Sequence, residues 1–261
     1  MTSNTISLNY KDYGSGSPLI ILHGLFGSLD NWFSLAKAFA DQHHVYLVDQ
    51  RNHGQSPHTD SHTYGDMAND LWEFFQTHEL TNAILIGHSM GGKTAMRFAA
   101  AHPERLVKLV VVDMGVKFYP VHHDLIIRSM QAVDLPKIAS RNAAEDELGC
   151  YITENDTLQF LLKNIYRARQ ADGTPQYKWR FNLDLLANEI EEMGLPIAEG
   201  SLLKTLFLYG DKSNYVRSED HAGIVRLFPN ANFASLHTGH WVHVEDPLGF
   251  IAAVKRFLGE N

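Results

Sequence analysis

The chain has 261 residues, of which 44% are hydrophobic, and it carries a formal net charge of −8. This length suits one α/β domain, or one domain with an inserted subdomain. The acidic balance argues against nucleic acid or an anionic membrane as the main partner, and the single cysteine, Cys150, excludes an internal disulfide.

No stretch approaches the roughly 18 consecutive apolar residues of a membrane span. The first residues show no basic segment followed by an apolar one, so we expect a cytoplasmic chain without a membrane span. No acidic or cysteine partner stands at zinc-ligand spacing from His240 and His243, and we expect neither a metal site nor a cofactor.

In the first part of the chain, the pattern predicts strands and helices in alternation. Residues 6–13 alternate apolar and polar positions, which is typical of a half-buried edge strand. Short, wholly apolar runs are typical of strands that are buried on both faces, and they occupy residues 19–22, 45–48, 83–86 and 106–112. Apolar positions at helical spacing predict helices at residues 32–39, 67–75 and 90–101.

The alternation stops between residues 117 and 200, where several helical patterns appear and no good strand does. One helical stripe runs from Leu158 through Leu162 to Ile165, and Pro and Gly separate the patterns. We expect a helical cap over 117–200, inserted into a core domain formed by residues 1–116 and 201–261.

Alternation resumes with strands at residues 205–209 and 233–236 and helices near 217–227 and 246–258. Repeated strand–helix units predict an α/β fold, with a mostly parallel central sheet flanked by helices. Ligand sites in such sheets lie at the carboxyl ends of the strands.

Residues 87–91, Gly-His-Ser-Met-Gly, match the G-x-S-x-G nucleophile elbow, in which a strand turns sharply into a helix with serine at the tip. Glycines at 87 and 91 remove side chains that would block so tight a turn. The helix that follows directs free N–H groups at the position where an oxyanion would form.

The same segment matches a rival motif, because residues 87–94 also fit the phosphate-binding pattern G-x-x-x-x-G-K-[ST], with Lys93 as the phosphate lysine. Four motifs follow predicted strands, and that interpretation uses only two of them, the loop itself and Asp113, which would hold magnesium. It leaves His23–Gly27 and Thr238–Trp241 without a role. Motif context therefore favours a serine nucleophile over a nucleotide-binding loop.

The chain resembles the α/β-hydrolase superfamily, and in particular a subgroup of small bacterial and mitochondrial esterases and acyl-CoA thioesterases. The resemblance covers nearly the whole chain and is weaker in residues 117–178. The stretches that carry it are His23–Asn31 (HGLFGSLDN), Arg51–Gly54 (RNHG), Gly87–Lys93 (GHSMGGK), Trp179–Asn182 (WRFN) and Gly239–Trp241 (GHW).

The motif order assigns Ser89 as the nucleophile and His240 as its general base, since the histidine of this fold comes last in the chain. Two positions compete for the acid. Asp113 ends an all-valine strand, and the resembling subgroup uses that position. Asp211 lies two residues before the common Gly-x-x-Asp position, which falls on Ser213 here. We favour Asp113 and keep Asp211 as the alternative.

The oxyanion hole needs two N–H donors, which we assign to the backbones of Met90, the residue after the nucleophile, and Leu25. Five side chains are candidates either for core packing or for lining a substrate pocket, and we assign them to the pocket: Phe26, His88, Trp179, Phe181 and Trp241. From the resemblance, Arg180 is assigned to an anionic leaving group.

We therefore expect a serine hydrolase that cleaves small-molecule carboxylic esters or acyl thioesters through an acyl-serine intermediate. The same fold also serves non-catalytic ligand receptors, which is the main alternative, since fold does not fix function. A P-loop nucleotide-binding protein is the remaining one.

Overall fold

The computed structural model describes residues 5–120, 123–169 and 172–260. Within this part of the chain, seven strands form one sheet in the order β1-β3-β2-β4-β5-β8-β9. Only β1 runs antiparallel to its neighbour. The strands of this sheet are β1 (Tyr10–Tyr13), β2 (Ser17–Leu22), β3 (His43–Val48), β4 (Ala83–His88), β5 (Leu106–Val112), β8 (Thr205–Gly210) and β9 (Ala231–Leu236).

The core helices lie where the apolar periodicity predicts them, with differences at their ends, except for the short helix Val242–Glu245, which it does not predict. In the core they are α1 (Phe33–Phe39), α2 (Tyr64–Thr77), α3 (Met90–Ala101), α8 (His221–Leu227), α9 (Val242–Glu245) and α10 (Pro247–Leu258). Between β5 and β8 lie α4 (Asp124–Ala132), α5 (Arg141–Gly149), α6 (Asn155–Leu162) and α7 (Leu183–Asn188). Short 3₁₀ helices occupy Leu29–Trp32, Pro103–Arg105, Leu135–Lys137, Ile190–Gly194 and Ser218–Asp220.

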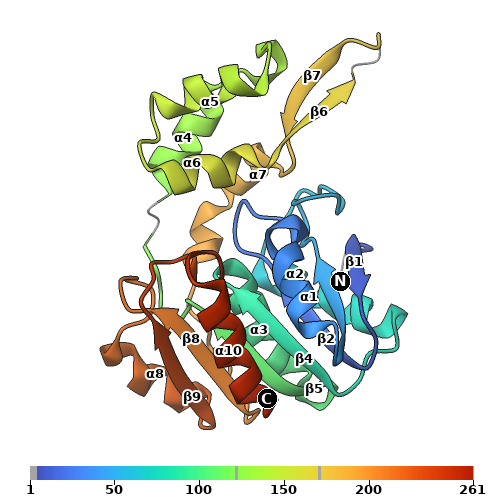
Figure 1. Ribbon diagram of the computed structural model, residues 1–261, viewed down its shortest axis with the longest axis vertical. Coiled ribbons are helices and arrows are strands. Elements are labelled where there is room, and N and C mark those ends of the chain that lie inside the picture. The colour runs from blue at the N-terminus through green and yellow to red at the C-terminus, as the bar shows by residue number, and fades with distance from the viewer. Residues whose placement is uncertain (1–4, 121–122, 170–171, 261) are drawn as a thin grey trace.

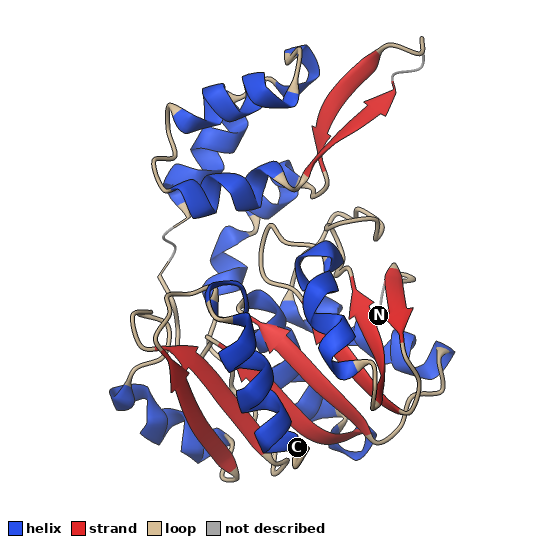
Figure 2. Cartoon of the chain, viewed as in Figure 1, coloured by secondary structure: helices blue, strands red, loops and turns tan. Residues whose placement is uncertain are grey.

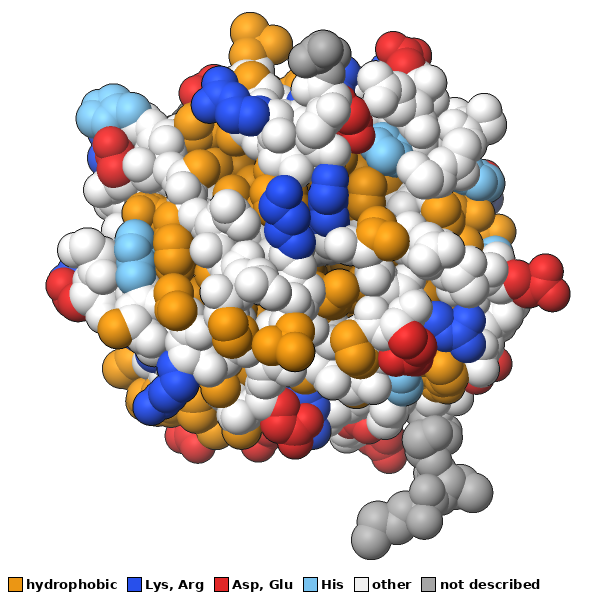
Figure 3. Space-filling model, turned by 90° about the horizontal axis from the view of Figure 1, so that it is seen from below, with side chains coloured by type: hydrophobic (Ala, Val, Ile, Leu, Met, Phe, Trp, Pro, Cys, Tyr) orange, Lys and Arg blue, Asp and Glu red, His pale blue; other side chains and the backbone are white. Residues whose placement is uncertain are grey.

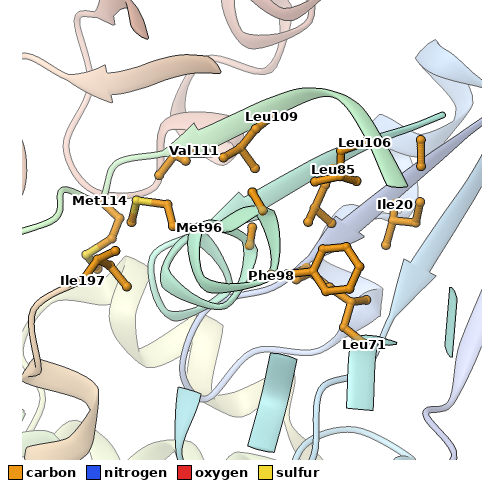
Figure 4. Close-up of a cluster of buried hydrophobic side chains, with 14 of the residues drawn as sticks. Ile20, Leu71, Leu85, Met96, Phe98, Leu106, Leu109, Val111, Met114 and Ile197 are labelled. Carbon is orange, nitrogen blue, oxygen red and sulfur yellow. The ribbon is translucent and has the colours of Figure 1, made fainter. Parts of the chain in front are cut away.

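Both faces of the sheet are buried, which explains the unbroken apolar runs of its central strands. Side chains alternate between the faces along each strand. In β2, Ile20 and Leu22 pack toward α2, α3 and α8, whereas Leu19 and Ile21 pack toward α1 and α10. Figure 4 shows part of the first cluster, in which Met96 and Phe98 of α3 lie against the sheet.

The segment between β5 and β8 forms a separate layer above the carboxyl ends of the parallel strands (Figure 1). Its own apolar cluster contains Met130, Leu148, Leu162 and Phe181. We keep 117–200 as the proposed bounds of this cap. Seen from the opposite end of the molecule, the surface mixes apolar side chains with charges of both signs (Figure 3).

One expectation for the cap is wrong: it contains a β-hairpin, drawn in red in Figure 2. β6 (Ile165–Arg169) pairs antiparallel with β7 (Pro175–Trp179). Ile165 continues the spacing of the α6 stripe and therefore suggested a longer helix. The chain instead leaves α6 at Leu162 and, within the turn, Gly173 takes a φ of 85° that favours glycine.

At the amino end, the predicted edge strand is shorter than expected, because pairing with β3 begins only at Tyr10. Among the described residues, no helix combines the length and the apolar character needed to cross a bilayer.

Candidate active site

Ser89 occupies a sharp turn between the end of β4 and the start of α3. Its backbone takes φ 53° and ψ −118°, a combination that costs energy in a residue other than glycine. A Cβ on Gly87 would lie 2.1 Å from the carbonyl oxygen of Gly91, and one on Gly91 would lie 2.5 Å from that of His23. Both glycines are therefore required for the close approach of strand, turn and helix.

His240 lies on the loop after β9, and its Nδ1 is 2.6 Å from Oδ2 of Asp113. The ring stacks on Tyr215 with 4.0 Å between ring centroids. Glu245 holds the loop by accepting hydrogen bonds from the backbone N–H groups of Gly239 and Trp241 at 2.8 and 3.2 Å. The histidine is thus oriented from its Nδ1 side, which leaves Nε2 for proton transfer.

Asp113 is fully buried at the end of β5, with a positive φ of 45°. Besides His240, its carboxylate accepts hydrogen bonds from Gly210 N at 3.1 Å and from the hydroxyl of Ser213 at 2.5 Å. Its charge is therefore compensated by polar donors and not by a cation within the described chain.

Asp211, the alternative acid, makes a different contact. Its carboxylate lies 3.0 Å from Nδ1 of His237, and this pair is exposed to solvent. The geometry thus brings Asp113, and not Asp211, to His240. Ser213 is a residue that our sequence analysis did not assign, although its place at the Gly-x-x-Asp position was the signal that it faces the site.

Ser89 and His240 line the same cavity, which has a volume of about 170 Å³ and lies between the sheet edge and α6 of the cap. Ser89 Oγ has no hydrogen-bond partner among the described residues, so the serine–histidine bond is not formed here. Catalytic hydrogen bonds are often long in unliganded sites and shorten when substrate binds.

The two assigned oxyanion donors are unengaged. Within the described chain, the backbone N–H groups of Leu25 and Met90 donate to no protein acceptor. Leu25, Ser89 and Met90 also line a second, mainly apolar cavity of about 30 Å³ with Met114 and Met193. Free donors beside a strained serine are the arrangement that stabilises a developing oxyanion.

The predicted pocket residues fall into two groups. Phe26, His88 and Trp241 line the cavity that contains Ser89. Trp179 and Phe181 stack on each other and line a different cavity of about 450 Å³, at the base of the cap hairpin.

Arg180 lies between these two aromatic residues in the sequence, and its guanidinium lies 5.4 Å from the centroid of the Tyr166 ring. In the described structure it lines none of the cavities that contain Ser89. Several cavity residues that sequence analysis did not assign reach the site from the cap or from later loops, and these include Phe160, Ile126, Met193 and Tyr215.

Buried histidines surround the site in their neutral form. Burial lowers the pKa of His88 well below its ordinary range and that of His243 to about 3. Neutral His88 can donate through Nε2 to the backbone carbonyl of His240 at 2.9 Å, which holds the loop that carries His240. Among the described residues, no group of three or more His, Cys, Asp or Glu side chains could hold a metal ion.

Lys93, the lysine of the rival phosphate motif, is fully buried. Its ammonium donates to the backbone carbonyls of Gly194 and Leu195, where the chain returns from the cap. The ring of Tyr119 lies 4.9 Å from the same nitrogen. Burial lowers the pKa of Lys93 to about 7. This lysine fastens the returning chain and does not face an open phosphate site.

Comparison with known proteins agrees with this architecture. Residues 17–148 match the family model described as the alpha/beta hydrolase fold. The chain is 40% identical over 265 residues to the sn-1-specific diacylglycerol lipase ABHD11 of Mus musculus, covering 97% of this chain and 85% of the relative. It is 34% identical over 263 residues to Esterase YbfF of Escherichia coli, covering all of both chains.

A solved structure named "Marine microorganism esterase" superposes with a TM-score of 0.92 at 40% identity, covering 97% of this chain and all of that one. The extent of these matches and the shared sheet leave no other assignment: the chain belongs to the α/β-hydrolase family, among relatives named esterases and lipases.

Proposed function

We propose that this protein hydrolyses carboxylic esters through an acyl-serine intermediate. The observation that supports this proposal most directly is the His240–Asp113 pair beside Ser89. An imidazole oriented by a buried carboxylate is the base that makes a serine hydroxyl nucleophilic. The relatives named esterase and lipase support ester hydrolysis as the class of reaction.

In the proposed reaction, Ser89 Oγ attacks the acyl carbonyl while His240 Nε2 takes the hydroxyl proton. The N–H groups of Leu25 and Met90 donate to the carbonyl oxygen as it becomes negative. His240 then gives the proton to the leaving alcohol, the tetrahedral centre collapses, and the acyl group remains on Ser89. Water repeats the sequence with the same base and releases the carboxylic acid.

The surroundings of the site favour an uncharged leaving group. A cavity of about 320 Å³ adjoins the one that contains Ser89 and shares His88, Phe160 and Trp241 with it. Its wall carries three acidic side chains and one lysine, Lys163. The acidic residues are Asp30, Asp156 and Glu245. Such a wall disfavours the phosphates of coenzyme A. We therefore propose neutral alcohol esters ahead of acyl-CoA thioesters.

The test combines covalent labelling with turnover. Wild-type protein is expected to react with a fluorophosphonate and to hydrolyse p-nitrophenyl esters, whereas Ser89→Ala does neither. A series of esters and acyl-CoA substrates with matched acyl chains then measures kcat/KM for the two leaving groups. Absence of labelling and turnover in the wild type would favour the ligand-receptor alternative, and preference for acyl-CoA would overturn the neutral leaving group.

A further inference from the structure

Two sequence motifs have no role in the reaction above, Arg51–Gly54 of the core and Trp179–Asn182 of the cap. The structure brings them together beside the oxyanion loop, by which we mean residues 23–27. Asn182 N donates to the carbonyl of Asn52 at 2.9 Å. The Asn182 amide also donates to Asn52 Oδ1 at 3.4 Å and to the carbonyl of Thr59 at 3.2 Å.

In the core, His53 follows Asn52 in the sequence and contacts the oxyanion loop itself. His53 Nε2 accepts a hydrogen bond from the backbone N–H of Phe26 at 3.1 Å. Its Nδ1 lies 2.9 Å from the carbonyl of Arg51, which fixes the tautomer with the proton on Nδ1. His53 is completely buried, and burial lowers its pKa well below the ordinary range, so the acceptor nitrogen stays free of a proton.

The oxyanion loop needs such support because its backbone is strained. Phe26 takes a φ of 59°, a left-handed conformation that is unfavourable for a bulky aromatic residue. It directly follows Leu25, whose N–H is one of the two assigned oxyanion donors. Asn52 is also left-handed, with a φ of 63°. Strain of this kind persists only where surrounding contacts overdetermine the conformation.

The cap adds a packing contact to the same point. The Phe181 ring lies 5.1 Å from that of Phe26 and 6.3 Å from that of His53. Phe181 therefore packs beside both residues that share the Phe26–His53 hydrogen bond, while its neighbour Asn182 bonds to Asn52. Phe181, which sequence analysis assigned to the acyl pocket, thus packs against Phe26 of the oxyanion loop.

We propose that His53 is a positioning residue for the oxyanion hole. The cap is connected to it by Asn182, through Asn52, and by Phe181, which packs directly beside Phe26 and His53. His53 holds the Phe26 N–H, which sets the direction of the preceding Leu25 N–H toward the carbonyl oxygen of the substrate. A donor displaced by about 1 Å can cost on the order of 100-fold in rate. This inference rests on the proposed acyl-serine mechanism.

Two substitutions of His53 separate the two hydrogen bonds. His53→Gln places an amide oxygen near the position of Nε2, so it can still accept from Phe26 N. His53→Asn keeps a donor for Arg51 but is too short to reach Phe26. We expect kcat for p-nitrophenyl butyrate to fall at least about tenfold in His53→Asn and to stay within about threefold of wild type in His53→Gln.

The measurements must distinguish a displaced oxyanion donor from a general loss of folded stability. KM is expected to change little in His53→Asn. The inhibition constant of phenylboronic acid, whose serine adduct places an oxygen in the oxyanion hole, is expected to rise about as much as kcat falls. A kcat that is unchanged in His53→Asn would overturn the proposal. An equal loss in both variants, accompanied by a lower Tm, would also overturn it.

The cap connection has its own matched pair. Asn182→Asp keeps the oxygen that caps α7 through Leu185 N but replaces the amide donor with a carboxylate. Ser140→Ala removes a similar cap, at the start of α5, away from the oxyanion loop. We expect kcat to fall about threefold or more in Asn182→Asp, with KM unchanged, and to be unaffected in Ser140→Ala. Equal kcat values in the two variants would contradict the connection.

Failure of the proposed function can be distinguished from failure of the positioning role of His53. If hydrolysis by the wild type does not depend on Ser89, the proposed function fails. If hydrolysis depends on Ser89 but is insensitive to His53→Asn, only the positioning role of His53 fails.

Discussion

Nδ1 of His240 lies 2.6 Å from Oδ2 of Asp113, although 127 residues separate them in the chain. The contact forms because β5 and β9 run parallel on either side of β8, so that their carboxyl ends open on the same edge of the sheet. A buried carboxylate in this position holds the imidazole in one tautomer and stabilises its charged form during reaction. This relationship leads to the first prediction.

Asp113→Asn is expected to lower kcat by about 10⁴, because an amide at this position favours the wrong tautomer of His240. Asp211→Asn is the matched control, since the same change there alters only an exposed contact with His237. Steady-state turnover of p-nitrophenyl acetate measures both. If only Asp211→Asn loses turnover, the acid has been misassigned.

Ser213→Ala is expected to lower kcat/KM by roughly tenfold or more, because a hydrogen bond to a charged group contributes about 1.5–3 kcal/mol. The Ser213 hydroxyl lies 2.5 Å from the Asp113 carboxylate that would lose this donor. Ser213→Thr, which keeps a hydroxyl, is expected to retain most of the activity. Wild-type kinetics in Ser213→Ala would show that the contact contributes nothing to catalysis.

Acidification is expected to destabilise the fold below about pH 6.5, the ordinary pKa of histidine. Burial lowers the pKa of five fully buried histidines, to about 3 for two of them, so the unfolded chain takes up protons that the folded chain does not. The free energy of unfolding therefore decreases as the pH falls from about 6.5 toward 3. The five are His23, His53, His62, His88 and His243.

His243 offers a clean control, because its ring stacks flat on Trp32 at 4.0 Å. His243→Phe preserves an aromatic ring and removes one titrating group. Urea denaturation at several pH values measures the unfolding free energy as a function of pH. Between about pH 6.5 and 3, we expect this free energy to depend less steeply on pH in the variant, by up to about 1.4 kcal/mol per pH unit. Equal slopes would mean that His243 is not kept neutral by burial.

Lys93 is expected to affect stability at the opposite end of the pH range. Burial lowers its pKa to about 7, so between about pH 7 and 10 the unfolded chain holds a proton that the folded chain has released. Stability due to Lys93 therefore rises with pH across this window. The unfolding free energy of the wild type, minus that of Lys93→Met, should increase from pH 7 to pH 9. A constant difference would contradict the prediction.

Local sequence determined the strands of the sheet and the sharp turn at Ser89. Short, wholly apolar runs predicted the central strands, because a strand buried on both faces tolerates little else. The requirement at Gly87 is local, because its Cβ would meet Gly91 within the same turn, whereas the Cβ of Gly91 would meet the carbonyl of His23. The G-x-S-x-G pattern is nevertheless short enough to be recognised in the sequence. The order of motifs along the chain was enough to select His240 and the oxyanion loop.

Tertiary structure decided what depends on contacts between distant segments. Asp113 and Asp211 both follow strands that end at the same edge, and only the spacing of β5, β8 and β9 settles which carboxylate meets His240. The cap hairpin escaped prediction because its half-exposed strands carry a weak pattern. Phe181 was assigned to a pocket by its aromatic character, whereas its partners, Phe26 and His53, come from the other layer of the molecule. Periodicity reports which side of an element is buried, but not against what it is buried.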